Sequence, residues 1–185
     1  LLKNEKEYAD QVYLRQPFKD VWTELTWSQV MNKARRVAQF MKDQGFKKGD
    51  KFSIYSKNCA EWFITDFGLT LAGMVNVPLF GNQHPDSISY ILDHAEIKMV
   101  FVGKLDDHKH ARMNIPEHMK TVGFDYHSDL TVDFTWEDMM KAEPVPDIVM
   151  PDANDMYTII YTSGTSGNPK GAVYNHDRIA TYLEV

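Results

Sequence analysis

Residues 161–171 combine hydroxyl groups, glycines and one lysine in a short segment with the sequence YTSGTSGNPKG. Glycine lets backbone N–H groups approach phosphate oxygens, hydroxyl groups add hydrogen-bond donors, and Lys170 adds a mobile positive charge. The hydroxyl groups come from Thr162, Ser163, Thr165 and Ser166. This composition predicts a loop that binds a polyanion through phosphate groups.

The residues on both sides of this loop have the composition of strands. Residues 156–161 are β-branched and aromatic, and residues 172–174 form a second short apolar run. A flexible linker is the alternative interpretation. We consider it weaker, because an Asn-Pro-Lys-Gly sequence followed at once by an apolar strand is unusual in linkers.

Two common phosphate-binding patterns do not fit the loop. Gly164 and Lys170 have the separation of the P-loop NTPase pattern, but Pro169 replaces its second glycine and Gly171 replaces its Ser or Thr. The glycines at 164, 167 and 171 do not have the dinucleotide-binding spacing. Ser163 lacks the G-x-S-x-G elbow of a nucleophilic serine.

The segment from Tyr161 to His176 resembles the signature loop of the AMP-forming adenylating enzymes. This superfamily includes acyl-CoA synthetases, luciferases and the adenylation domains of peptide synthetases. Ser166 stands where Thr is most frequent in the family, which keeps the hydroxyl group. Further segments resemble the family in the same order along the chain, at residues 25–29, 49–54, 56–62 and 71–79. Residues 58–62 and 173–176 are most similar to fatty acyl ligases of medium or long chain length.

The resemblance implies a two-step reaction for the parent protein. ATP and a carboxylate, expected to be a medium- or long-chain fatty acid, would form an acyl-adenylate and pyrophosphate. The acyl group would then pass to a thiol, expected to be coenzyme A. A non-catalytic nucleotide- or protein-binding module of the same fold, and a P-loop NTPase, are the alternative functions.

The resemblance also implies the roles of the loop residues. Lys170 would be the catalytic residue, and Thr162 would help to hold Mg²⁺. The residues that would bind ATP are Thr162, Ser163, Gly164, Thr165, Ser166, Gly167 and Lys170. The adenine pocket, a Mg²⁺-binding Glu, a ribose-binding Asp and a late catalytic Lys would lie beyond Val185. We therefore expect the isolated chain to be inactive.

The pattern of elements predicts an α/β fold with a mostly parallel sheet and flanking helices. The resemblance identifies it as the N-terminal part of an adenylation domain, truncated before the rest of the large domain. We expect an α/β subdomain over residues 1–145 and the start of the next segment over 146–185, because prolines surround this boundary. The chain begins at Leu1 and stops inside an expected helix opened by Asn175 or Asp177, so we expect a piece of a longer protein.

Individual elements follow from periodicity and capping residues. A hairpin is expected over residues 12–25, and a helix from Thr26, whose capping box uses Gln29, to Gly45. Further helices are expected at 60–71, 85–95, 106–114 and 136–142, and strands at 52–55, 74–77, 99–102 and 121–124.

Composition excludes several classes of protein. The net charge of -6 over 185 residues argues against a nucleic-acid binder. No apolar run is long enough to span a membrane, although peripheral membrane contact stays open. The single cysteine, Cys59, excludes an internal disulfide and fits a reducing compartment, so we expect a cytoplasmic protein. A homodimer also stays open.

Three other groups of residues have both a structural and a functional interpretation. His108 and His110 lie in a polar stretch, and we favour a solvated helix face over a metal site. We expect Cys59 to be a small core residue rather than a reactive thiol. The aromatic residues Trp62, Phe63 and Phe67 are expected in the core rather than in an acyl pocket.

Overall fold

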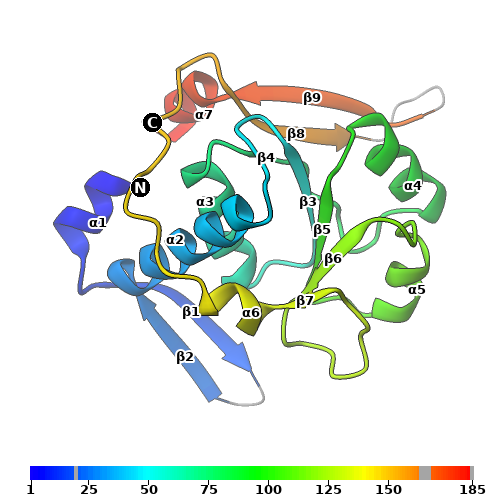
Figure 1. The fold of residues 1–185 in the computed structure, drawn as a ribbon, viewed down its shortest axis with the longest axis horizontal. Helices are drawn as coiled ribbons and strands as arrows, with labels where there is room; N and C mark the ends of the chain where they lie inside the picture. The colour runs from blue at the N-terminus through cyan, green and yellow to red at the C-terminus, as the bar shows by residue number, and fades with distance from the viewer. Residues whose placement is uncertain (19–20, 163–167, 184–185) are drawn as a thin grey trace.

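The computed structural model describes residues 1–18, 21–162 and 168–183. In this part of the chain, a seven-stranded sheet has the strand order β7-β6-β5-β3-β4-β8-β9. Helices α2 and α3 cover one face of the sheet, and α4 and α5 cover the other (Figure 1). The predicted α/β fold with a mostly parallel sheet is confirmed, because all neighbouring strands from β7 to β8 are parallel.

The helices and strands have the following bounds. The sheet contains β3 (Lys51–Tyr55), β4 (Val75–Asn76), β5 (Met99–Val102), β6 (Lys120–Gly123), β7 (Phe134–Thr135), β8 (Met156–Thr162) and β9 (Lys170–Asn175). The helices are α1 (Leu2–Tyr8), α2 (Trp27–Asp43), α3 (Ala60–Leu71), α4 (Pro85–His94), α5 (His108–Met113), α6 (Trp136–Lys141) and α7 (His176–Leu183). A separate hairpin contains β1 (Val12–Phe18) and β2 (Val21–Thr26).

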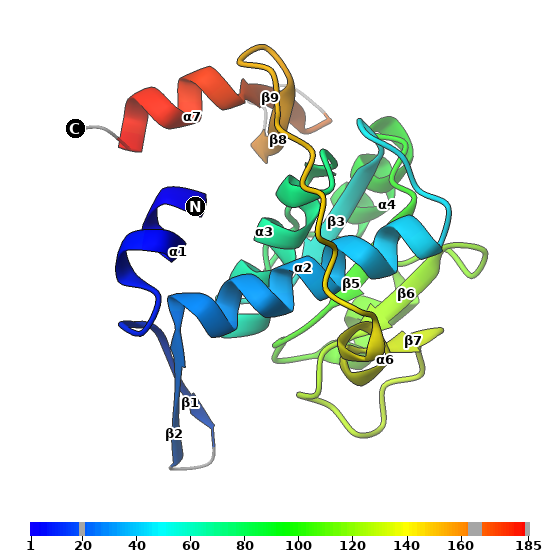
Figure 2. The ribbon, with the colours of Figure 1, turned by 60° about the vertical axis from the view of Figure 1, so that its left-hand side comes forward.

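Most predicted elements are confirmed to within two residues. Thr26 accepts a hydrogen bond from the Gln29 backbone, the Gln29 side chain reaches back to the Thr26 backbone, and the helix ends before Gly45. The β1–β2 hairpin projects from the start of α2 (Figure 2). The sequence analysis missed α1 and the short strand β7. The division at residue 145 stays a prediction.

Side chains that alternate along the strands build two separate cores. In β5, Met99 and Phe101 join the core under α2, α3 and α6, while Val100 and Val102 join the core under α4 and α5. This alternation arises because successive residues of a strand point to opposite faces of the sheet. Since both faces are covered, the strand is apolar throughout.

Helices α2 and α3 cross at close range because of one glycine. A Cβ atom built at Gly68 would lie 2.6 Å from Val37 Cβ and 2.9 Å from the Ala34 carbonyl oxygen. Both α2 residues are fully buried. Gly68 therefore determines how near the two helices lie.

A buried carboxylate joins α3 to two neighbouring strands. Asp66 of α3 accepts a hydrogen bond from Tyr157 Oη of β8 at 2.7 Å and from Asn76 Nδ2 of β4 at 2.8 Å. Thr158 Oγ1 also donates to the Asn76 carbonyl oxygen at 2.7 Å. Burial raises the pKa of Asp66, although both hydrogen bonds oppose this shift. These side-chain bonds hold β8 against β4, where the ladder pairs Asn76 with Thr158.

Among the helices in the described part of the chain, none is long and apolar enough to cross a membrane.

We expect Gly68→Ala to destabilise the protein by about 1–3 kcal/mol, because the new methyl group has to separate α2 from α3. This cost should exceed the gain of up to ~1 kcal/mol from the better helix propensity of alanine. Chemical denaturation measures the change. Gly81→Ala is the control, since its Cβ would meet Leu105 Cδ2 and Lys57 Cγ at an ordinary 3.4 Å. Equal stability of the Gly68→Ala variant and the wild type would contradict the close crossing.

The raised pKa of Asp66 predicts a pH dependence of stability. The folded state binds this proton more tightly than the unfolded state, whose aspartate pKa is about 3.9. Stability from the protonated group is therefore fully present below about pH 4 and declines as pH rises through the raised pKa. The stability of the wild type relative to Asp66→Asn should fall over this window and then become constant. Denaturation from pH 4 upward measures it, with exposed Asp10→Asn as a control for the loss of one charge. A relative stability that rises with pH would show that the hydrogen bonds outweigh burial.

Candidate functional site

The β8–β9 hairpin carries the loop that the sequence singles out. Its strands pair antiparallel, with Tyr161 opposite Gly171 and Thr162 opposite Lys170. Both Thr162 and Lys170 are exposed. The pairing therefore places a hydroxyl group and an ammonium group on neighbouring strands, where the loop leaves the hairpin and returns.

The structure describes only part of the predicted site. Thr162 and Lys170 are brought together, and β9 begins at Lys170, two residues earlier than expected. The other predicted residues lie outside the described part of the chain, and their roles stay predictions: Ser163, Gly164, Thr165, Ser166 and Gly167. Strands on both sides of the loop are confirmed.

The far end of the hairpin is held by helix α7. Asn175 Oδ1 accepts a hydrogen bond from the Arg178 backbone N–H at 3.0 Å, so Asn175 rather than Asp177 caps the helix. His176 lies against Tyr157 with 5.3 Å between ring centroids. Burial lowers the pKa of His176, which favours its neutral form. His176 therefore packs on the strand that contacts Asp66 rather than beside Lys170.

The loop end of the hairpin is held by helix α4. Tyr161 is buried, and its hydroxyl oxygen lies 2.6 Å from Nδ1 of His94. Sequence reasoning missed His94. The two residues are 67 positions apart, and nothing in the local pattern around His94 indicates a partner on β8.

The remaining candidates have structural roles. His108 Nε2 lies 2.7 Å from Asp129 Oδ1, and its ring stacks on His127 at 4.0 Å. Burial raises the pKa of the Cys59 thiol, as expected for a core residue rather than a reactive one. Trp62 and Phe67 are half-buried against the core, and Phe63 is half-buried beside Trp62.

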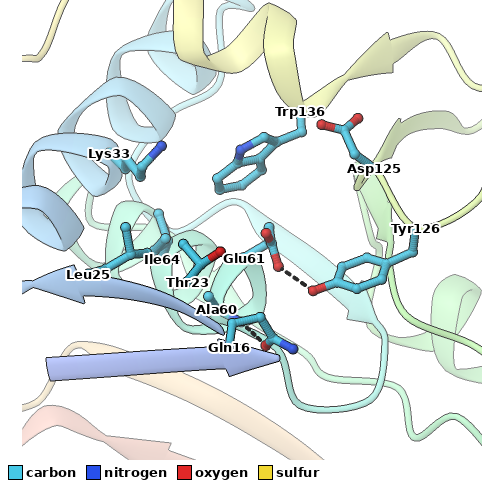
Figure 3. A pocket seen from close by; sticks show the side chains of 10 residues that line it. All are labelled: Gln16, Thr23, Leu25, Lys33, Ala60, Glu61, Ile64, Asp125, Tyr126 and Trp136. Atoms are coloured by element: carbon cyan, nitrogen blue, oxygen red, sulfur yellow. Dashed lines mark hydrogen bonds between the residues drawn. The ribbon is translucent and has the colours of Figure 1, made fainter. Parts of the chain in front are cut away.

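A cavity of about 260 Å³ lies between the β1–β2 hairpin, α2, α3 and the segment after β6 (Figure 3). Tyr126 Oη donates to Glu61 at 2.8 Å, and Gln16 Oε1 accepts from the Ala60 N–H at 3.0 Å. Burial, together with the charges of Glu61 and Glu137, raises the pKa of Asp125 in this cavity. Neither Thr162 nor Lys170, the two predicted loop residues that the structure describes, lines it, and its carboxylates disfavour a phosphate group.

Comparison with known proteins gives a consistent family. The family described as AMP-binding enzyme matches residues 2–185. Long chain acyl-CoA synthetase 1 of Arabidopsis thaliana is 30% identical over 85% of this chain and 26% of its own length. A long-chain-fatty-acid–CoA ligase of Homo sapiens is 29% identical over 85% of this chain and 26% of its own length. The chain thus spans about a quarter of the length of these relatives.

Solved structures share the fold at lower sequence identity. An anthranilate CoA ligase in complex with anthranoyl-AMP has a TM-score of 0.82 at 22% identity, over 98% of this chain and 35% of that protein. An acyl-CoA synthetase of Brucella canis has a TM-score of 0.78 at 23% identity, over 94% and 32%. The fold is that of the N-terminal part of adenylate-forming enzymes. With the family match over nearly its whole length, the chain belongs to the family of AMP-binding enzymes.

Proposed function

We propose that the protein containing this chain is an ATP-dependent, AMP-forming ligase that activates a carboxylate and transfers the acyl group to coenzyme A. The observation that carries this proposal is the pair Thr162 and Lys170, exposed on adjacent strands at the loop end of the β8–β9 hairpin. In the first step the carboxylate attacks the α-phosphate and pyrophosphate leaves. In the second step the thiol of coenzyme A attacks the acyl carbon and AMP leaves.

Lys170 stabilises the charge that develops on pyrophosphate. Among the ion pairs of the described residues none includes Lys170, so its ammonium group is available to a ligand. A charged donor that meets negative charge growing in the transition state accelerates the reaction more than it strengthens ground-state binding. Backbone and hydroxyl groups of Ser163, Gly164, Thr165, Ser166 and Gly167 complete the contacts to the β- and γ-phosphates.

Thr162 fits the neighbourhood of a nucleotide-bound Mg²⁺. Among the described residues no group of three or more His, Cys, Asp or Glu side chains could hold a metal. Mg²⁺ takes most of its ligands from phosphates and water and needs few from the protein. When bound, the ion neutralises phosphate charge. The exposed Thr162 hydroxyl would help to hold it.

The proposed acyl substrate is a fatty acid of medium or long chain. Its support is that several of the relatives are long-chain acyl-CoA synthetases or ligases. The resemblance of residues 58–62 and 173–176 to fatty acyl ligases agrees with this. A cytoplasmic location and a homodimer stay predictions.

Replacing Lys170 tests the phosphate role in the full-length protein. Lys170→Ala should lower the adenylation rate about 10- to 100-fold. This factor corresponds to the loss of one charge-assisted hydrogen bond, which contributes about 1.5–3 kcal/mol. ATP binding should weaken less. Lys170→Arg should restore only part of the adenylation rate, because a planar guanidinium group replaces the compact ammonium group. Pyrophosphate exchange and single-turnover adenylation measure these effects.

The second half-reaction supplies the control for Lys170→Ala. Thioester formation from added acyl-adenylate should be nearly unchanged, because pyrophosphate has already left. Exposed Lys6→Ala in α1 should affect neither step. Equal damage to both half-reactions would mean that Lys170 supports the fold or the acyl site, and the phosphate assignment would then be wrong.

The 185-residue chain alone should form no acyl-adenylate, because it spans about a quarter of its relatives' length. The adenine and ribose contacts would come from the remainder. We expect no pyrophosphate exchange and no ATP·Mg²⁺ binding tighter than about millimolar by calorimetry, which corresponds to about 4 kcal/mol. Measurable exchange by the chain alone would place the complete site within these residues.

A further inference from the structure

Tyr161 occupies the last buried position before the loop. It is 4% exposed, whereas its neighbour Thr162 is exposed. Tyr161 belongs to the core beneath α4, together with Ile159 two residues earlier on the same face of β8. Because side chains alternate along a strand, Thr162 lies on the opposite face of the hairpin. Any influence of Tyr161 on the Thr162 side chain therefore acts through the backbone.

The ring of Tyr161 lies across Gly171, its partner on β9. A Cβ atom built at Gly171 would lie 3.0 Å from Tyr161 Cζ and 2.8 Å from Ile159 Cγ2. A side chain at this position would force Ile159 to shift and would press on the ring of Tyr161. An aromatic ring over a cross-strand glycine also holds that strand in register. Gly171 directly follows Lys170, so the ring contacts the residue next to the ammonium-bearing one.

The outer edge of the ring is held by α4. The hydroxyl oxygen of Tyr161 lies 2.6 Å from His94 Nδ1, and the two rings are perpendicular at 5.9 Å. Tyr90, one turn earlier on α4, stacks on the imidazole at 5.1 Å with 21° between the planes. Burial raises the pKa of Tyr161, so its hydroxyl stays protonated and can donate to an imidazole nitrogen. The ring is thus fixed at both ends.

We propose that Tyr161, held between Gly171 and His94, is a positioning residue that sets the place of Lys170 relative to Thr162. This inference rests on the proposed function of Lys170. The contacts fix Gly171 against β8 and therefore fix the preceding residue in the pair Thr162–Lys170. A displacement of about 1 Å in a charged group can lower a reaction rate about 100-fold. The contacts that hold β9 in place should therefore affect the adenylation rate.

The test is a double-mutant cycle in the full-length protein. Tyr161→Leu removes the ring and the hydrogen bond and should slow adenylation about 10- to 100-fold with a smaller change in the KM for ATP. Tyr161→Phe and His94→Gln retain the rings' approximate volumes and should cost about 2- to 10-fold, as for one neutral hydrogen bond. In a Lys170→Ala background each change should add less than about 3-fold, because residues that act as one unit are not additive.

Two matched controls accompany the cycle. Tyr8→Phe removes a hydroxyl that bonds to Glu7 on the exposed helix α1, and should have no effect on adenylation. Gly171→Ala should slow adenylation about 5- to 100-fold by displacing the ring, whereas Gly81→Ala, with ordinary contacts, should not. Thioester formation from added acyl-adenylate should be unchanged in all these variants. A loss that is fully additive with Lys170→Ala would overturn the positioning role.

A second readout does not depend on catalysis. Amide hydrogen exchange without nucleotide should be faster at residues 170–173 in Tyr161→Leu and Gly171→Ala than in the wild type, because β9 loses its anchor. Exchange in β5 should be unchanged, which excludes general unfolding. Unchanged exchange at 170–173 would overturn the inference by itself. If the wild type shows no pyrophosphate exchange, the proposed function fails, and the anchor is still judged by the amide rates.

Discussion

The hydrogen bonds to Asp66 are the interaction on which the placement of the β8–β9 hairpin depends. Strands β4 and β8 meet in a short ladder, so backbone pairing alone gives little support to the hairpin that β8 begins. The carboxylate compensates by accepting bonds from both strands. A buried carboxylate is costly unless it is bonded, and removing a donor would leave it unsatisfied. The hydrogen bonds therefore favour one register of β8 against β4, because any other register would move Tyr157 away from Asp66.

Strand β8 of the hairpin is held in place at both of its ends. At one end, the Asp66 cluster and His176 hold Tyr157. At the other end, His94 holds Tyr161. Strand β8 is thus anchored at two points on opposite faces of the sheet, and these anchors fix the paired, exposed residues Thr162 and Lys170 at its end. In many binding sites the functional residues lie on a loop whose position is set by a rigid scaffold.

Local sequence signals predicted most of the fold. The capping box at Thr26 and the helical spacing of the apolar residues in α2 can both be recognised within one short segment of sequence. The helix that they predict is present. The short strand β7 and the helix α1 have too few periodic residues to be recognised. The sequence also predicts a phosphate site at Lys170 and its neighbours, and this stays a prediction. It could not indicate Asp66 or His94, because their partners are distant in the chain and each residue alone resembles a surface polar residue.

The order of strands has a consequence for handling the chain by itself. Within the described residues, β9 pairs with β8 on one side, and its other side is an open edge of the sheet. Val173 in this strand is 53% exposed. Open edges with apolar residues invite pairing with a second copy, which leads to aggregation unless charges or a covering segment prevent it. Solubility of a recombinant chain would therefore depend on what shields β9, and a charged residue in place of Val173 is the natural change for producing material for study.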